Sequence, residues 1–470
     1  MDHKIFLGAP SRPLRVAIVG SGPSGFYAAE ALFKQPGLNA RVDMFERLPT
    51  PYGLVRGGVA PDHQKIKSVT VVYERIASLP GFRFFGNVTM GRDIQVEDLR
   101  RHYDQIIYAV GCQKDRSLGI PGEEMAGNHS ATSFVGWYNG HPDYRNEVFD
   151  LSQEKVAVIG VGNVAMDVAR ILVENPERLA KTDIAPYAIE ALRKSRVKEI
   201  YILGRRGPAQ AAFSLAEIQE IAGLELSDLV IKPDEAAIDE LSRTGLSDPI
   251  IKKKVDFLTE QSKRGTGSKT KKVHLRFCVS PIEVLAEGEK VKTLKIEKNV
   301  LTLDGKGGAR AKGTGRFETL AVGLVFRSVG YHGAPIDGVS FDQESGHIPN
   351  EQGRVLNSAT ATVLVGEYVV GWAKRGPSGL VGANRADSQA LVKVMAEDVS
   401  ARRFGWDNPD PSCGPIETLL AARGVKAVSF ADWKILDKIE VERGARLGKV
   451  REKFTSVPEM LDALALKLNF

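Results

Sequence analysis

Apolar, largely β-branched runs alternate along the chain with glycine-rich turns and helix-forming stretches. Residues 14–19 and 40–45 form the first two runs, and residues 26–32 between them favour a helix. Short, mostly apolar runs of this kind are typical of parallel strands that are buried on both faces. The same order of elements begins again with runs at 155–159 and 199–203. The pattern therefore predicts an α/β protein with two Rossmann-like units.

Further apolar runs indicate how the two units are connected. Runs at 104–111 and 323–330 each end in glycine, and we expect them to carry the chain from one unit to the other. A run at 361–366 predicts one more strand, and a helix is expected at 385–397 after a glycine-rich loop. This order predicts a glutathione-reductase-like arrangement, with the second unit inserted into the first. The expected domains are residues 1–112 together with 333–470, and residues 113–332.

The stretch from 224 to 318 is more polar, first helical and then hairpin-like in pattern. Within it, 252–254 and 263–272 are rich in lysine and are expected to form exposed loops. Residues 304–308 predict a turn between antiparallel strands. Beyond residue 404 three prolines break the pattern, and the amphipathic helices that follow are expected to form a C-terminal cap.

A GxGxxG motif, Gly20 to Gly25, lies between the first strand and its helix. Gly20 permits a tight turn, Gly22 lets the backbone approach a pyrophosphate, and Gly25 lets the helix pack on the strand. The second strand ends in Glu46, whose carboxylate would accept hydrogen bonds from ribose hydroxyls and repel a 2′-phosphate. These features predict an FAD site. The alternative is an ordinary glycine turn between a strand and a helix.

A second motif, GxGxxA at 160–165, follows the strand at 155–159. Here the next strand ends in Arg205 and Arg206 rather than in an acid. Guanidinium groups at this position would pair with a 2′-phosphate and select NADPH over NADH. The alternative is that both arginines belong to a solvated turn. The chain thus presents two dinucleotide motifs with opposite charge preferences.

The loop at 371–384 offers a third candidate surface. Its glycines would let a flavin ring lie against backbone, and Trp372 supplies a flat apolar face. An ordinary glycine-rich loop would have the same composition, so this alternative stays open.

The composition limits the redox chemistry that the side chains could carry out. Hydrophobic residues make up 43% and charged residues 26% of the 470 residues, as is usual for a globular protein. Three scattered cysteines, Cys112, Cys278 and Cys413, form neither a CxxC centre nor a disulfide framework. This excludes a thioredoxin-reductase mechanism, so redox chemistry must come from a bound cofactor, and no metal site is expected.

Charge and hydropathy address partners and location. The net charge of +6 suits an acidic partner. Nucleic acid is the rival partner, but the chain has no zinc-finger spacing or RNA-binding signature. No apolar run is long enough to cross a bilayer, and the first 15 residues lack the apolar stretch of a signal peptide. We therefore expect a cytoplasmic protein that binds neither membranes nor nucleic acids.

Five segments together resemble the adrenodoxin-reductase-type ferredoxin–NADP+ reductases. They appear in the family's order and extend from residue 16 to at least 391, with Ser24 standing where the family often has alanine. The Pro-Tyr-Gly-Leu-Val-Arg and Trp-x-Lys-Arg-Gly-Pro pieces are more specific than the glycine motifs. The matching segments are 19–28, 51–63, 162–170, 204–208 and 371–379.

The resemblance implies specific cofactor contacts. Those expected with FAD are Ser24, Glu46, Leu54, Val88, Trp372, Gly379, Leu380 and Val381. Those expected with NADPH are Gly162, Asn163, Val164, Ala165, Arg205, Arg206, Glu217 and Gly379. The family's histidine and acid near the flavin and nicotinamide correspond to His63 and Asp167. Without the family, a loop histidine and a helix-terminus charge would be the simpler interpretations.

The resemblance also implies the activity. NADPH would give a hydride to FAD, and electrons would pass singly to an acidic ferredoxin with a [2Fe–2S] or similar cluster. Alternatives of the same architecture are an NADPH diaphorase or quinone reductase and the electron-input subunit of a glutamate synthase. The latter usually has an N-terminal cysteine-rich segment, which is absent here. A non-catalytic flavin-binding regulator would need a degraded nicotinamide site. We expect a monomer.

Overall fold

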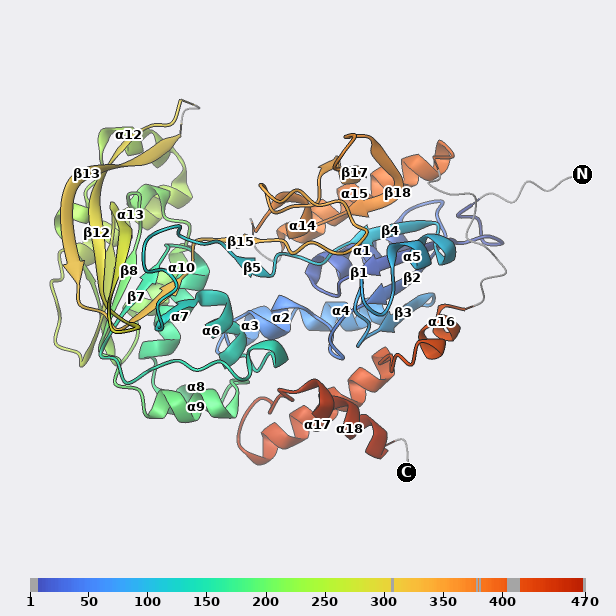
Figure 1. Cartoon of the computed structure of the whole chain (residues 1–470), viewed down its shortest axis with the longest axis horizontal. Coiled ribbons are helices and arrows are strands. Elements are labelled where there is room, and N and C mark those ends of the chain that lie inside the picture. The colour runs from blue at the N-terminus through green and yellow to red at the C-terminus, as the bar shows by residue number, and fades with distance from the viewer. Residues whose placement is uncertain (1–6, 306–307, 378, 380–381, 404–414, 468–470) are drawn as a thin grey trace, which may run out of the picture.

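The computed structural model describes residues 7–305, 308–377, 379, 382–403 and 415–467. Two α/β parts lie next to each other along the long axis of the molecule (Figure 1). Each part is built around a sheet of parallel strands, and we name them the seven-stranded part and the six-stranded part. The chain passes between them through the paired strands β5 (Lys114–Asp115) and β15 (Tyr331–His332).

The seven-stranded part combines segments from both ends of the described chain. In spatial order its strands are β16 (Asn350–Glu351), β17 (Arg354–Leu356), β18 (Val363–Val369), β4 (Gln105–Tyr108), β1 (Leu14–Val19), β2 (Ala40–Phe45) and β3 (Phe82–Phe85). Its longer helices are α1 (Pro23–Lys34), α4 (Thr70–Ala77), α5 (Val96–His102), α15 (Ala383–Ser400), α16 (Ile416–Ala422), α17 (Phe430–Arg446) and α18 (Val457–Lys467). Three single-turn helices are α2 (Leu54–Gly57), α3 (Gln64–Lys67) and α14 (Trp372–Arg375).

β1 is buried on both faces, as its sequence predicts. Val16 and Ile18 point into a core shared with α1, α15, α17 and α18, whereas Ala17 and Val19 point into a second core with α5 and α16. β1 pairs in parallel with β2 so that Val19 lies opposite Phe45. Because parallel strands end at the same edge of a sheet, this register brings the first glycine turn beside the end of β2.

The six-stranded part repeats this plan. Its strands in spatial order are β6 (Asn128–Ser130), β14 (Leu324–Arg327), β7 (Lys155–Ile159), β8 (Glu199–Leu203), β10 (Lys271–Arg276) and β9 (Ser227–Ile231). Its helices are α6 (Ala131–Tyr138), α7 (Asn163–Val173), α8 (Pro176–Leu179), α9 (Pro186–Arg193), α10 (Leu215–Ala222), α11 (Pro233–Ala236), α12 (Glu240–Arg243) and α13 (Pro249–Ser262). An antiparallel sheet of β11 (Val279–Glu287), β12 (Lys290–Leu303) and β13 (Ala309–Leu320) covers one face through its own apolar core. At the predicted turn the Asp304 N–H donates to the Gly308 carbonyl at 2.9 Å, and residues 306–307 lie outside the described residues.

Of the two predicted lysine-rich loops, the one at 252–254 is wrong, whereas the one at 263–272 is confirmed except for its last two residues. Lys252 to Lys254 lie within α13, which Asp248 caps and Pro249 begins. The ammonium of Lys254 is buried and donates to the carbonyl oxygen of Ala211. In the second segment, residues 263–270 form the expected loop and all but Lys269 are exposed; the last two residues begin β10, a central strand between β8 and β9. Long lysine stems pack along apolar surface while their charged ends find acceptors, so lysine-rich sequence alone did not reveal these elements.

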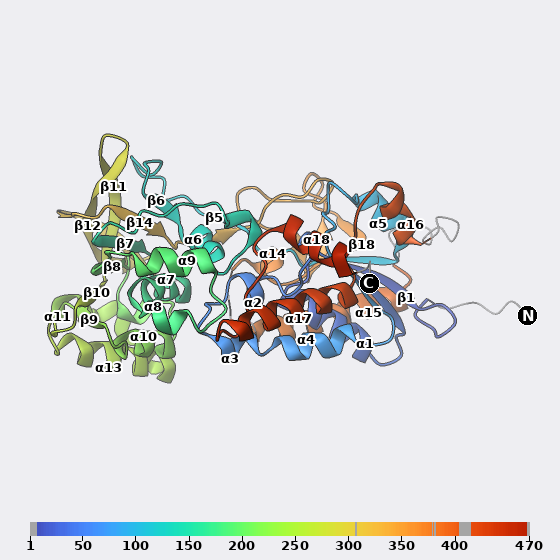
Figure 2. The same cartoon turned by 90° about the horizontal axis from the view of Figure 1, so that it is seen from below.

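The C-terminal helices form the predicted cap, and the loop between them reaches the other part (Figure 2). α17 and α18 run along the seven-stranded part and bury Trp433 against Tyr52. In the connecting loop, the Lys449 ammonium donates to the Ile184 carbonyl at 3.0 Å, and the Val450 N–H donates to the Lys181 carbonyl at 3.2 Å. None of the helices within the described ranges is long and apolar enough to span a membrane.

Replacing Gly20 by alanine is expected to lower the free energy of unfolding by on the order of 1–3 kcal/mol. Gly20 has φ of +106°, and an added Cβ would lie 2.5 Å from the carbonyl oxygen of Ala109. Gly22 is the matched control, since its φ is −75° and nothing would lie within 4 Å of an added Cβ. Urea denaturation without bound nucleotide measures both variants. Equal destabilisation by the two alanines would contradict this account.

Candidate functional site

The first glycine turn forms an open cradle at the N-terminus of α1. An added Cβ at Gly22 would meet no atom, whereas one at Gly25 would clash with the carbonyl oxygen of Gly20. Glu46 follows β2, and its carboxylate accepts from the Ser21 hydroxyl at 2.6 Å and the Ser21 N–H at 3.2 Å. The N–H of Val88 donates to the Glu46 carbonyl at 2.9 Å. The turn, the acid and Val88 are therefore brought together.

Two further segments border this cradle. Ser24 on α1 bonds Asn384 on α15 at 3.0 Å, and an added Cβ at Gly371 would collide with the Ser24 hydroxyl. Trp372 begins the short helix that follows, and its indole nitrogen is buried with no hydrogen-bond partner among the described residues. Leu54 begins α2 beside the same turn and is 45% exposed although apolar. An open backbone cradle, an unpaired indole N–H and an exposed leucine fit a flavin dinucleotide.

The last predicted flavin contacts fall at the start of α15. Gly379 is exposed and has φ of +84°, a backbone conformation that favours glycine. Leu380 and Val381 lie outside the described residues.

The second glycine turn has a similar opening, with no atom within 4 Å of an added Cβ at Gly162. Asn163 follows it on α7 and accepts from the Ser214 N–H at 2.9 Å, which ties α7 to the start of α10. Ala165 is fully buried and Val164 packs against the same core. These residues shape the turn, and only its glycine face is open to a phosphate.

Arg205 and Arg206 follow β8 after Gly204, which lies against Val161 of this turn. Backbone bonds hold them, because Asn299 donates to the Arg205 carbonyl at 2.9 Å and the Cys278 N–H donates to the Arg206 carbonyl at 3.1 Å. Burial and the adjacent Arg205 lower the pKa of Arg206. Neither guanidinium forms an ion pair with any residue that the structure describes. Two neighbouring cations without a counter-charge are suited to an anionic ligand.

A charged cluster around His63, which we call the His63 cluster, lies where the two parts meet. The Nε2 atom of His63 is 2.9 Å from Glu220 Oε2, and its Nδ1 atom is 3.8 Å from Asp167 Oδ1. Arg170, whose side chain is 3% exposed, forms ion pairs with Asp167 at 2.5 Å and with Asp62. Asp62 and His63 belong to the seven-stranded part, and the other three residues belong to α7 and α10. The cluster therefore joins the two parts.

Protonation in this cluster departs from ordinary values. Burial alone would lower the pKa of His63, but Asp167, Glu220 and Glu217 together raise it. Burial and the nearby Glu217 raise the pKa of Asp167 to about 8, although His63 opposes this rise. Burial also raises the pKa of Glu217. Carboxylates outnumber cations here, and their mutual repulsion adds to burial in raising the pKa of Asp167 and of Glu217.

The predicted pair of His63 and Asp167 is thus brought together, and Glu217 joins them. One ligand-type atom each of His63, Glu217 and Glu220 lies within 4.8 Å of the others. Glu220 and Arg170 were not among the residues that the sequence indicated as functional. Arg170 is three residues after Asp167 on α7, and Glu220 is three residues after Glu217 on α10. This helical spacing, which places both members of a pair on one face, was the available signal.

Comparisons with known proteins show the family to which this chain belongs. Residues 14–203 match the pyridine nucleotide-disulphide oxidoreductase family. NADPH-ferredoxin reductase FprA of Mycobacterium tuberculosis is 44% identical over 457 residues, which cover 96% of this chain and 99% of the relative. The mitochondrial NADPH:adrenodoxin oxidoreductase of Homo sapiens is 39% identical, covering 96% and 92% respectively. The chain belongs to the adrenodoxin-reductase-type family of ferredoxin–NADP+ reductases.

A solved member of this reductase family agrees in fold. The structure of Mycobacterium tuberculosis FprA in complex with NADPH superposes with a TM-score of 0.89 at 43% identity, covering 97% of this chain and 100% of that one. The predicted fold class, with two Rossmann-like units, is confirmed. The resemblance inferred from the five segments is confirmed as well.

Glu220→Gln is expected to lower the pKa of His63, because it removes a carboxylate that contacts the imidazole. A histidine with a raised pKa stabilises the fold below its ordinary pKa of 6.5, and this contribution is lost as pH rises through the folded value. In the Glu220→Gln variant, this stabilising contribution of His63 is expected to be lost at a lower pH. NMR titration with histidine-selective labelling measures the shift. Glu225→Gln, an exposed residue after the same helix, is the control, and equal shifts in both variants would contradict the contact.

Proposed function

We propose that this protein is a ferredoxin–NADP+ reductase that transfers electrons between NADPH and a ferredoxin-type iron–sulfur protein through bound FAD. The observation that carries the proposal is the position of the His63 cluster. It links the two parts that carry the glycine turns, and the strand ends beside these turns have opposite charge. Membership of the reductase family supports the same activity.

The seven-stranded part provides the FAD site in this proposal. Gly22 and the N-terminus of α1 approach the pyrophosphate, and Glu46 accepts from ribose hydroxyls. Trp372 and Leu54 border the flavin, and Ser24, Val88 and the segment 379–381 complete the contacts. FAD supplies the conversion between a hydride, which carries two electrons, and single-electron transfer.

The six-stranded part provides the NADPH site. Gly162 to Ala165 receive the pyrophosphate at the N-terminus of α7, and Arg205 and Arg206 pair with the 2′-phosphate. Two observations support this assignment: the open face at Gly162 and the absence of counter-charges around the two arginines among the described residues.

His63 and Asp167 are proposed to act where the two sites meet. The His63 ring lies between Asp167 and Glu220, so that it is held from two sides. Asp167 holds or releases a proton close to neutral pH, since its pKa is about 8. Glu217 adds a third carboxyl group beside the nicotinamide site. These groups fix geometry and charge around the hydride-transfer step, which needs no covalent nucleophile.

We also propose the remaining attributes expected from the sequence. The domains are 1–112 with 333–470 for FAD and 113–332 for NADPH, and sheet membership supports this division. The partner is an acidic ferredoxin, which the net charge of +6 would attract at low salt. The protein acts as a cytoplasmic monomer that binds neither nucleic acid nor membrane.

The activity is tested on the purified protein. It is expected to be yellow and to reduce ferricyanide with NADPH much faster than with NADH. It should also reduce cytochrome c only when ferredoxin is added, at a rate that falls with salt. A colourless protein would contradict the FAD assignment. Cytochrome c reduction that does not depend on ferredoxin would favour a diaphorase instead.

The double variant Arg205→Ala/Arg206→Ala is expected to narrow the preference for NADPH over NADH. Charge-assisted hydrogen bonds contribute about 1.5–3 kcal/mol, so the ratio of kcat/KM values should fall roughly tenfold to a hundredfold. Steady-state kinetics with both nucleotides measures this ratio. Arg193→Ala is the control, because Arg193 lies on the same part but pairs with Glu177 at the surface. An unchanged ratio in the double variant would remove these arginines from the 2′-phosphate site.

A further inference from the structure

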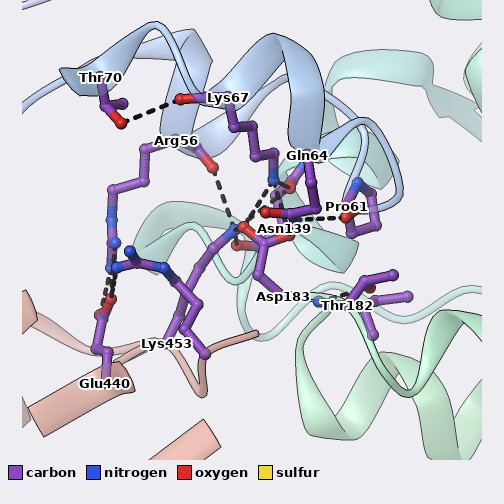
Figure 3. Close-up of polar contacts among 12 residues, drawn as sticks. Arg56, Pro61, Gln64, Lys67, Thr70, Asn139, Thr182, Asp183, Glu440 and Lys453 are labelled. Carbon is purple, nitrogen blue, oxygen red and sulfur yellow. Dashed lines mark hydrogen bonds and ion pairs between the residues drawn. The ribbon is translucent and has the colours of Figure 1, made fainter. Parts of the chain in front are cut away.

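Three buried charges form a second link between the two parts (Figure 3). The ammonium of Lys67 lies 2.8 and 2.7 Å from the two carboxylate oxygens of Asp183. The ammonium of Lys453 lies 3.0 Å from one of these oxygens. All three side chains are buried, and that of Lys453 is only 2% exposed. We call this group the Lys–Asp–Lys cluster.

Each member comes from a different segment. Lys67 ends α3 of the seven-stranded part, and Asp183 lies in the loop between α8 and α9 of the six-stranded part. Lys453 lies in the loop between α17 and α18. The cluster therefore holds three segments at one point, although they are far apart along the chain.

The surrounding atoms satisfy the buried charges. Lys453 also donates to the carbonyl oxygens of Asn139 at 3.0 Å and Arg56 at 3.2 Å. Lys67 donates to the side-chain oxygen of Asn139 at 3.3 Å. Burial lowers the pKa of both lysines, and both ammonium groups lower the pKa of Asp183 against the effect of its burial. A buried ion pair specifies geometry strongly, because any displacement leaves an uncompensated charge.

A second ion pair fixes the loop that carries Lys453. Glu440 on α17 is fully buried and bonds Arg56 at 2.5 Å and Arg451 at 3.1 Å. It also accepts from the Phe454 N–H at 2.9 Å. The residues on both sides of Lys453 are thus held, so its ammonium is presented to Asp183 at a defined position.

The Lys–Asp–Lys cluster lies one helical turn from His63. α3 spans only Gln64 to Lys67, and the carbonyl oxygen of His63 accepts from the N–H groups of Ile66 at 3.0 Å and Lys67 at 3.2 Å. Gln64 also reaches Asp183, at 3.2 Å. This single turn is therefore held against the six-stranded part at both ends, by His63 on Glu220 and by Lys67 on Asp183.

We propose that Lys67, Asp183 and Lys453 are positioning residues that hold His63 in contact with Asp167 and Glu220. The role assigned to His63 rests on the proposed reductase function, but its contact with Glu220 does not depend on that function. A helix of one turn cannot maintain its own geometry, so the orientation of His63 must come from its anchors. The Lys–Asp–Lys cluster provides such an anchor, and its three residues take no part in the hydride transfer itself.

The contact between His63 and Glu220 can be measured through the pKa of His63. Removing the Lys67 charge changes that pKa directly, so a single variant is ambiguous. The fall in pKa that Glu220→Gln causes is a better measure, because it reports the interaction between His63 and Glu220 alone. The charged groups that face His63 from the surrounding elements are Asp62, Lys67, Asp167, Arg170, Glu217 and Glu220.

The experiment compares this fall between the otherwise unchanged protein and a Lys67→Met background, using NMR titration of the FAD-loaded, full-length protein. Methionine keeps most of the volume of the stem and removes the charge. We expect the fall caused by Glu220→Gln to be less than half as large in the Lys67→Met background. A fall of the same size in both backgrounds would overturn the proposal, as would the absence of any fall in the otherwise unchanged protein.

Two further variants keep the test decisive. If Lys67→Met does not fold, Lys67→Gln decides by the same criterion, because it removes the charge that pairs with Asp183 but keeps a hydrogen-bond donor on the side chain. Lys198→Met is the matched control: its ammonium pairs with Glu154 at 2.7 Å on the surface, and the fall should stay unchanged. A protein without NADPH-dependent reduction but with the expected pKa changes would refute the proposed function and leave the positioning role intact.

Discussion

Arg170 lies almost wholly buried on α7 and forms ion pairs with Asp167 of its own helix and with Asp62 of the other part. Breaking a buried pair of this kind costs about 3–5 kcal/mol, whereas an exposed pair contributes about 0–1 kcal/mol. The buried ion pairs between the two parts therefore contribute more free energy than the many surface pairs to fixing how the parts pack together. The arrangement of His63 and Asp167 depends on this constraint.

The two dinucleotide turns share one geometry and differ in charge. In both, a buried strand ends in a glycine whose φ is positive, and a helix starts with an open glycine face. The end of the neighbouring strand is acidic at Glu46 and basic at Arg205 and Arg206. Because parallel strands end at one edge, the charge at the next strand end lies beside each turn, and we propose that this charge sets which nucleotide the turn favours.

The C-terminal cap has a role beyond covering apolar surface. Trp433 buries itself against Tyr52 of the seven-stranded part, while Lys449 and Lys453 reach the six-stranded part. One segment therefore packs on the first part and bonds the second. Its position at the junction explains why charges in it are buried although the cap itself lies at the surface.

The sequence by itself determined the strands, the two turns and the cofactor preferences. These depend on local patterns: β1, β2, β7 and β8 have the predicted bounds, Glu46 follows β2 directly, and Arg205 lies two residues after β8. The lysine-rich pattern at 252–254 wrongly predicted an exposed loop. Lys254 is buried because its ammonium donates to the carbonyl oxygen of Ala211, 43 residues earlier in the chain.

Only the tertiary structure decided which charges meet across the junction. Glu220 is 157 residues from His63, and Asp183 is 116 residues from Lys67. No local spacing encodes such pairs, because they form only when two separately folded sheets pack together. The two glycine turns could therefore be predicted from the sequence, whereas the residues that hold the two parts together could not.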